Sequence, residues 1–189
     1  MILPILPYGN PILKTKALEI NESYPKLKDL LKNMWETMYS ANGVGLAAPQ
    51  IGLSIRIFII DTFAFSEQEE LSKRESSELA SFKKVFINPK IVEQNGNDWD
   101  FNEGCLSIPD IREDVSRKEL LKISFFDENF VFKTLDLKGI KARVVQHEYD
   151  HIEGILFTDH LSSFKKRILK NKLKNISKGE IKTDYLMKF

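Results

Sequence analysis

The sequence has little of what marks several classes of protein. It contains one cysteine, Cys105, so no disulfide can close within the chain, and the secreted disulfide-rich folds are excluded. Its 9 glycines and 7 prolines are too few for a collagen-like or low-complexity chain. No stretch approaches about 18 consecutive apolar residues, so we expect no transmembrane helix and no membrane partner. The first eleven residues hold three prolines and lack the basic region of a signal peptide, so we expect a cytoplasmic protein.

The composition that remains is ordinary for a folded chain. Of the 189 residues, 42% are hydrophobic and 29% are charged, and this length is enough to bury a substantial core. We expect a single domain over residues 1–189. The net charge is +1 but uneven, because residues 161–189 contain nine Lys or Arg and only two acidic residues. A basic C-terminal helix and tail therefore follows an acidic body.

Hydrophobic patterning predicts helices towards both ends of the chain. Apolar residues recur at helical spacing over 24–40, and Ser23 is suited to cap that helix. A second helix is expected over 137–153 and should end at Gly154. A third, basic and amphipathic, is expected over 161–175.

The segments between these helices are typical of strands. Residues 55–61 are almost all apolar, and the pieces KVFINP and IVEQ are separated by a break at Asn88-Pro89. Residues 120–126 and 130–135 alternate in polarity and predict a hairpin. Strands flanked by helices, without regular alternation of the two, favour an α+β fold.

The segment HEYDH at 147–151 follows the HExxH pattern. On a helix, this spacing places His147 and His151 one turn apart on the same face, where both can bind one metal ion. Glu148 can then reach a water on that metal. Ile140 and Val144 share the histidine face, so the histidines point where the apolar residues point. The alternative is that these are ordinary core or surface histidines.

The third ligand decides the kind of metal site. Phe157 stands where a metzincin protease has its third histidine, and His160 comes three residues too late. Glu180 is the only glutamate beyond the helix, but it lies in the basic tail. Cys105, preceded by Gly104 in what we expect to be a shaped loop, would complete a three-ligand site with an open fourth position. A lone cysteine is equally consistent with a small buried residue.

The segment Gly43–Gly52, GVGLAAPQIG, is rich in small residues. It does not match the GxGxxG pattern, because Ala48 stands at the third glycine position, so a phosphate loop is not indicated. Small residues in a row more often allow close packing. Gln50 is the polar exception, suited either to a hydrogen bond within a turn or to donation towards a substrate carbonyl.

Taken together, three segments resemble peptide deformylase. That family has a G-x-G-hydrophobic-A-A-x-Q segment, an E-G-C-L-S segment and a Q-H-E-x-D-H helix, in that order. They stand here at Gly43–Gln50, Glu103–Ser107 and Gln146–His151 without a departure at a defining position. The resemblance spans about Pro4–Leu161 and is interrupted at residues 66–81, which look like an insertion forming an exposed loop or a short polar helix.

The resemblance implies a fold, an activity and a metal. The fold would be antiparallel sheets packed around the helix that carries HExxH. The activity would be hydrolytic removal of the formyl group from the N-terminal formylmethionine of nascent polypeptides, with release of formate. One divalent metal ion per chain is implied, foremost Fe(II), with zinc, nickel or cobalt as alternatives.

The resemblance also implies roles for individual residues. The metal ligands would be Cys105, His147 and His151, and Glu148 would be the general acid and base. Gln50 and the backbone N–H of Leu106 would bind the oxyanion. The residues expected to contact the substrate are Val44, Gly45, Glu103, Gly104, Arg112 and Val144. Ile140 is a weaker candidate for the methionine pocket.

Two other classes of function stay open. A metallopeptidase shares the HExxH pattern, although Phe157 speaks against it. A metal-stabilised binding module without turnover would not need both Glu148 and Gln50.

The basic tail also allows two interpretations. It is either a solvated terminal helix or a contact to the ribosome near the exit tunnel, where the substrate emerges and phosphate attracts basic side chains. We expect Leu161, Phe164, Ile168 and Leu169 to dock this helix on the body, and we expect a monomer.

Overall fold

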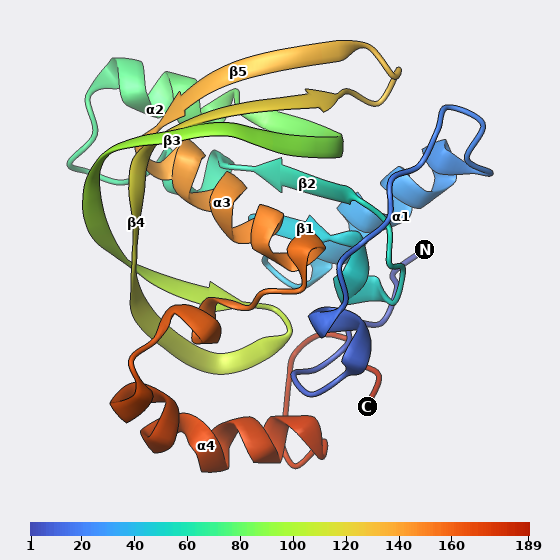
Figure 1. The fold of residues 1–189 in the computed structure, drawn as a ribbon, viewed down its shortest axis with the longest axis vertical. Helices are drawn as coiled ribbons and strands as arrows, with labels where there is room; N and C mark the ends of the chain where they lie inside the picture. The colour runs from blue at the N-terminus through green and yellow to red at the C-terminus, as the bar shows by residue number, and fades with distance from the viewer.

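The computed structural model describes residues 1–189 and places its helices around one antiparallel sheet (Figure 1). The helices are α1 (Leu27–Ser40), α2 (Lys73–Ala80), α3 (Gly139–Glu153) and α4 (Ser163–Ser177). The strands are β1 (Gly45–Ala47), β2 (Ile57–Asp61), β3 (Lys83–Cys105), β4 (Ile108–Phe126) and β5 (Phe132–Lys138). Short 3-10 helices are η1 (Pro11–Lys14), η2 (Ala48–Ile51), η3 (Phe63–Phe65) and η4 (Phe157–His160).

The sheet curves around α3. Its strands lie in the order β1-β2-β3-β4-β5, and every neighbouring pair is antiparallel, which confirms the predicted α+β class. Strands β3 and β4 have 23 and 19 residues and form one long hairpin whose register shifts at several bulges. Bulges bend a strand pair, and Figure 1 shows this hairpin arching around α3. Helix α3 contacts β1, β2, β4 and β5, so the HExxH segment lies inside the curve.

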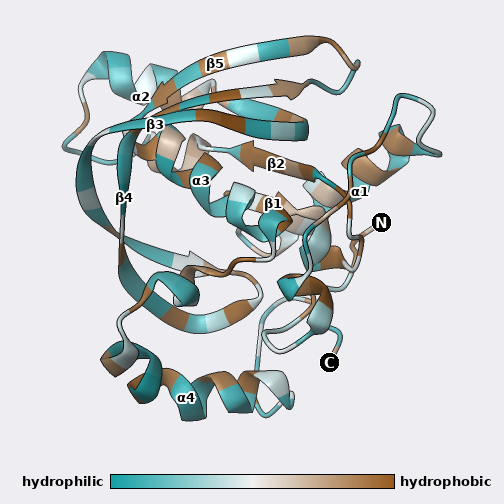
Figure 2. Ribbon diagram, in the orientation of Figure 1, coloured by the Kyte–Doolittle hydropathy of each residue, from teal (hydrophilic) through white to brown (hydrophobic).

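Strand β2 is apolar up to its last residue, Asp61, because both of its faces are covered. Phe58 and Ile60 belong to the core cluster that contains the buried residues of α3. Ile57 and Ile59 point the other way, into the cluster that contains α1, as the two-residue period of a strand requires. In Figure 2 most of β2 is brown, whereas α4 alternates brown and teal.

Helix α4 packs on the body with a face that matches the predicted one only in part. Leu161 and Leu169 are buried in the third core cluster, as expected. The buried residues of the helix are Leu169, Leu173 and Ile176, which join the third core cluster. Phe164 and Ile168 are 63% and 62% exposed, so the prediction that they dock the helix was wrong. The sequence offers two apolar stripes on this helix, and the shape of the body selects the second.

The helix predicted over 24–40 begins later, at Leu27. Lys26 precedes it with a φ of 56°, in the left-handed region, and no side chain caps the helix, so the prediction for Ser23 was wrong. Helix α3 does end before Gly154, whose φ of 76° suits the residue that terminates a helix. None of the helices combines the length and the apolar character needed to cross a membrane.

The polar segment 66–81 contains α2, which decides between the loop and the short helix expected there. Ser72 begins the helix with a reciprocal capping box, in which its hydroxyl accepts from the Glu75 N–H and the Glu75 carboxylate accepts from the Ser72 N–H. The capping box explains how so polar a segment forms a helix.

The predicted break at Asn88-Pro89 is a bulge within β3. Asn88 has a φ of 48°, and the pairing with β4 shifts between Ile87 and Lys90. The Asn88 amide accepts from the Ile20 N–H at 3.0 Å and donates to the Ile20 carbonyl at 2.6 Å. The strand therefore continues past the proline, and the bulge ties it to the N-terminal segment.

Candidate active site

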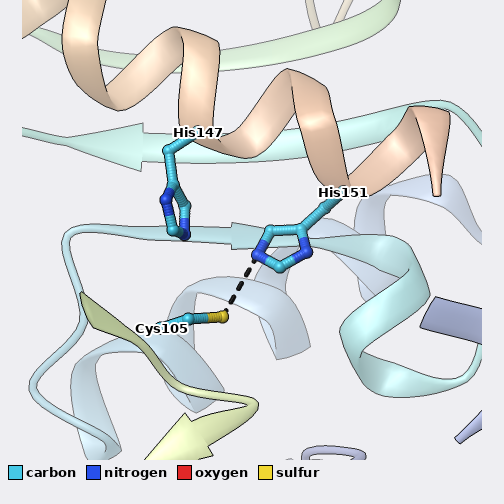
Figure 3. A group of neighbouring side chains, drawn as sticks. All are labelled: Cys105, His147 and His151. Carbon is cyan, nitrogen blue, oxygen red and sulfur yellow. Dashed lines mark hydrogen bonds between the residues drawn. The ribbon is translucent and has the colours of Figure 1, made fainter. Parts of the chain in front are cut away.

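Helix α3 and strand β3 bring three possible metal ligands together. His147 and His151 lie one turn apart on α3, and Cys105 is the last residue of β3 (Figure 3). The ligand atoms of these three side chains all lie within 4.8 Å of one another. The Cys105 Sγ lies 3.2 Å from the His151 Nε2. Neither Glu180 nor His160 belongs to this group.

The sequence had indicated a loop at Cys105, but the structure holds this residue by strand pairing. It pairs with Ile108, and Leu106 and Ser107 form the tight turn that connects β3 to β4. We call residues 105–108 the 105–108 turn. Its backbone also accepts a hydrogen bond from the Tyr8 N–H to the Ser107 carbonyl, at 2.7 Å. The ligand sulfur is thus fixed to the end of a paired strand.

The chemistry of the three donors fits a transition-metal ion. Burial acts to raise the pKa of the Cys105 thiol, but the neighbouring His151 and His147 outweigh it and lower that pKa to about 5. The sulfur is therefore suited to act as a thiolate, the form that binds metal. One thiolate and two imidazoles suit zinc, iron, nickel or cobalt and do not suit magnesium or calcium.

A buried carboxylate orients one of the two histidines. The Glu103 Oε2 lies 2.9 Å from the His147 Nδ1, so the other ring nitrogen of His147 is left for a metal. Arg117 donates to Glu103 at 2.7 and 3.0 Å, and Arg143 donates to it at 3.0 Å. Burial alone would raise the pKa of Glu103, but His147 and Arg117 together hold it below its usual value. Glu103 is therefore placed to orient His147, and its expected contact with the substrate stays a prediction.

Asp150 extends this charged network to the surface. Its Oδ2 accepts from Arg117 Nη1 at 2.7 Å and lies 2.7 Å from the His160 Nε2. Asp150 is therefore an ion-pair partner that also steadies Arg117, which in turn holds Glu103.

The carboxyl group of Glu148 is buried beside the same histidines. Its Oε2 has no hydrogen-bond partner within the protein. Burial raises the pKa of Glu148 to about 7. Gly45 of β1 lies directly against it: a Cβ on Gly45 would lie 2.3 Å from the Glu148 Oε1. A carboxyl group that titrates near neutral pH is suited to both accept and return a proton.

Gln50 and the 105–108 turn place two donors near the cysteine. The Gln50 Oε1 accepts from the Ala47 N–H at 2.8 Å, which turns the amide nitrogen the other way. That Nε2 donates to the Ser107 Oγ at 3.3 Å and lies 3.5 Å from the Cys105 Sγ. The Leu106 N–H donates to no acceptor within the protein.

These groups open into one cavity of about 510 Å³. Glu148, His147, Cys105, Gln50 and Leu106 all line it. His151 lies behind this wall and is only 1% exposed. A pocket of this size is in the range of cavities that bind small molecules or short peptide segments.

Comparison with known proteins identifies the family. A sequence model described as Polypeptide deformylase matches residues 2–167. The chain is 58% identical over 189 residues to a peptide deformylase of Christiangramia forsetii, with 100% of this chain and 96% of the relative covered. It is 57% identical to the peptide deformylase of Flavobacterium johnsoniae over the same shares. The chain belongs to the peptide deformylase family.

Solved deformylase structures share the fold. The peptide deformylase of Plasmodium falciparum has a TM-score of 0.79 at 34% identity, covering 93% of this chain and 95% of that one. That of Legionella pneumophila also has a TM-score of 0.79, at 33% identity, covering 95% and 98%. Deformylases remove the N-terminal formyl group from nascent peptides, and this chain matches them over its full length.

The deformylase cavity gathers most of the predicted site residues and adds others. Besides the groups already described, the predicted residues that line it are Val44, Gly45, Glu103, Gly104, Arg112 and Val144. Ile140 does not line it. Sequence reasoning missed the wall residues Phe65, Phe101, Asp110 and Tyr185. No local pattern marks them, because the folded chain brings them to the cavity from separate segments.

Replacing Gly45 by alanine should strongly lower deformylase activity by moving Glu148. The new Cβ would lie 2.3 Å from the Glu148 Oε1 and 2.6 Å from its Cδ, so the carboxyl group must shift. A displacement of about 1 Å at a reacting group can cost about a hundredfold in rate. We expect formate release to fall by about that factor while metal content stays the same. Gly45→Ala protein that is loaded with metal and keeps more than about a tenth of the activity would contradict this packing argument.

Proposed function

We propose that this deformylase is a metal-dependent amide hydrolase with its metal held by Cys105, His147 and His151. The observation that carries the proposal is the meeting of these three donors in one group beside Glu148. A divalent ion held there would supply a Lewis acid and would make water acidic enough to act as a nucleophile near neutral pH.

We assign the proton transfers to Glu148. Its carboxyl group would accept the proton of the attacking water and give it to the α-amine that leaves. A pKa of about 7, raised by burial, supports both directions of transfer at neutral pH. The position of its carboxyl against Gly45, beside the histidine pair, supports the same assignment.

We assign the oxyanion to Gln50 and Leu106. The Ala47 N–H donates a hydrogen bond to the Gln50 Oε1, which turns the Gln50 Nε2 towards the 105–108 turn. The Leu106 N–H is a free backbone donor on the cavity wall. Donors fixed before the reaction stabilise the developing charge at little reorganisation cost, and one such donor contributes about 3–4 kcal/mol.

The substrate peptide would lie along β1. This strand is at one edge of the sheet, so the backbone of Val44 and Gly45 is placed to pair with an extended peptide. Val144 would contact the methionine side chain. Arg112, near Gly104 at the rim, donates to the Asn102 carbonyl at 2.6 Å and is placed to meet the peptide further along.

The structure of α3 and its neighbours disfavours a metallopeptidase of the metzincin kind. Phe157, at the position of the third histidine, is 1% exposed and packs in the third core cluster, with its ring 6.3 Å from that of His147. An apolar core side chain cannot ligate a metal, which supports Cys105 as the third donor.

The direct test is formate release from a formyl-Met tripeptide. Protein purified without oxygen should release formate when loaded with Fe(II), should stop when treated with a chelator, and should recover when metal is restored. Folded, metal-loaded protein that releases no formate would refute the proposal, and the unblocked tripeptide would then be assayed for cleavage.

Further properties are proposed with the activity. We propose one metal ion per chain, foremost Fe(II), with zinc, nickel or cobalt as substitutes, because a thiolate with two imidazoles accepts all four. We propose a cytoplasmic monomer. We also propose that residues 1–189 form one catalytic domain, which is supported by relatives that match across the whole chain. Metal analysis and light scattering of the native protein test these points.

We also propose that α4 contacts the ribosome through its exposed basic residues. The double substitution Lys170→Glu and Lys174→Glu changes two exposed lysines one turn apart, neither of which makes an ion pair. We expect it to weaken ribosome binding several-fold and to flatten its dependence on salt. Lys28→Glu with Lys73→Glu makes the same charge change elsewhere and serves as the control. If both double variants lost ribosome binding equally, the loss would be a general effect of charge, and this result would contradict a ribosome-binding site on α4.

A further inference from the structure

The C-terminal tail reaches the active site. After α4, residues 178–189 return to the body, and Figure 1 shows this red segment running beside the blue N-terminal segment. The Ile5 N–H donates to the Leu186 carbonyl at 2.9 Å, and the Lys188 N–H donates to the Ile5 carbonyl at 3.0 Å. Ile5 and Met187 form a parallel bridge. The tail is therefore tied to the N-terminal segment by backbone hydrogen bonds.

Side chains anchor the tail on both sides of Tyr185. Ile181 packs against the third core cluster, which contains the buried face of α4. Tyr185 and Met187 pack against the cluster that contains α1, and Leu106 packs against the same cluster. Tyr185 is thus held beside the 105–108 turn by contacts before and after it in the sequence.

Tyr185 makes one hydrogen bond to the 105–108 turn. Its hydroxyl donates to the Leu106 carbonyl at 2.7 Å, and its side chain lines the cavity. The N–H of the same residue, Leu106, donates to nothing within the protein. Tyr185 therefore holds the carbonyl end of the residue whose amide end is available to a substrate.

In a turn this short, a hydrogen bond that holds the Leu106 carbonyl also restricts the peptide group that carries the Leu106 N–H. Cys105 and Ile108 are paired across the turn, so its two ends are fixed. Rotating the peptide between Leu106 and Ser107 then requires compensating rotations at its neighbours, including the peptide that carries the Leu106 N–H. A hydrogen bond on the Leu106 carbonyl limits these rotations.

We propose that Tyr185, from the C-terminal tail, is a positioning residue of the deformylase reaction, which holds the 105–108 turn so that the Leu106 N–H faces the reacting carbonyl. The inference rests on the proposed role of that N–H as an oxyanion donor. Tyr185 lies beyond residues 2–167, the part of the chain that matches the family's sequence model. The tail is then a working part of the active site as well as an extension of α4.

The test is Tyr185→Phe, which keeps the ring and removes the hydroxyl. We expect kcat for the formyl-Met tripeptide to fall about threefold to tenfold, the range for loss of one hydrogen bond, with KM within about twofold. Metal content should stay at its starting value, and the thermal unfolding temperature should fall by no more than about 5 °C, as expected for one lost hydrogen bond. Tyr24→Phe is the control, because Tyr24 is half-buried and its hydroxyl makes no hydrogen bond within the protein.

Hydrogen–deuterium exchange provides a readout that does not depend on turnover. Amides of the 105–108 turn should exchange faster in Tyr185→Phe than in the unsubstituted protein, and those of β5 should not change. Unchanged exchange, unchanged kcat, or a rise in KM with kcat preserved would each overturn the inference, the last by making Tyr185 a substrate contact. If the unsubstituted protein itself released no formate, the proposed function would fail, a result distinct from an active enzyme that is indifferent to Tyr185.

Discussion

Glu148→Ala protein should keep its metal and lose nearly all deformylase activity. The carboxyl group is assigned both proton transfers, and general acid–base catalysis contributes about a hundredfold to ten-thousandfold. We therefore expect kcat to fall by at least about a thousandfold, with stoichiometric metal by elemental analysis. The proposed ligand atoms come from Cys105, His147 and His151, so removing the carboxyl leaves the donor group intact.

The same substitution should not destabilise the fold. The Glu148 Oε2 is buried without a partner, and an unpaired buried polar group costs free energy in the folded state. The unfolding temperature of Glu148→Ala should therefore equal or exceed that of the unsubstituted protein, as is common where a site trades stability for activity. Glu148→Gln, which preserves the shape of the side chain, should be equally inactive.

Two results would contradict this role. Near-normal formate release by metal-loaded Glu148→Ala would show that another group moves the protons. Loss of metal together with activity would leave the carboxyl as a contributor to metal binding. Glu153→Ala, at the end of the same helix and away from the cavity, is a control for activity and metal content but not for stability, because Glu153 pairs with Lys16 and with the buried Arg56.

The parts of the fold that were predictable are those encoded locally. The HExxH helix has an apolar face and a glycine at its end, and both are visible in a short window of sequence. The hairpin between β4 and β5 shows the alternation of a half-buried strand pair. The middle of β3 could not be predicted, because most of residues 93–100 are exposed and carry no apolar alternation. Pairing with β4 makes that stretch a strand.

The residues of the site also divide into those that a local sequence pattern predicts and those that it does not. His147, Glu148 and His151 follow from spacing on one helix, whereas Cys105 comes from a distant strand and was chosen through the family resemblance. Tyr185 follows Leu106 by 79 residues, and nothing in the intervening sequence links them. The docking face of α4 depended on the shape of the body. Residues joined only by tertiary contacts were therefore either reached through the family resemblance, as Cys105 was, or missed, as Tyr185 was.

Cys105→Ala should abolish metal binding along with activity. Partners that merely orient a ligand are worth about 10–100-fold in metal affinity, so loss of a ligand should cost at least about a hundredfold. We expect less than a tenth of the normal metal after dialysis, and formate release reduced in proportion. Retained metal in Cys105→Ala would place the third ligand elsewhere and remove the basis for the proposed site.

The chain supplies both a matched control and an independent readout for this prediction. His160→Ala removes the one histidine outside the donor group and should leave metal content unchanged, whereas His151→Ala should behave like Cys105→Ala. Because Cys105 is the only thiol, a thiol-reactive reagent reports on this residue alone. With its pKa lowered to about 5, the metal-free thiol should react rapidly at neutral pH, and added Zn²⁺ should protect it. Protection at one Zn²⁺ per chain would tie the metal to this sulfur without any substitution, and an equally fast reaction with and without Zn²⁺ would exclude it as a ligand.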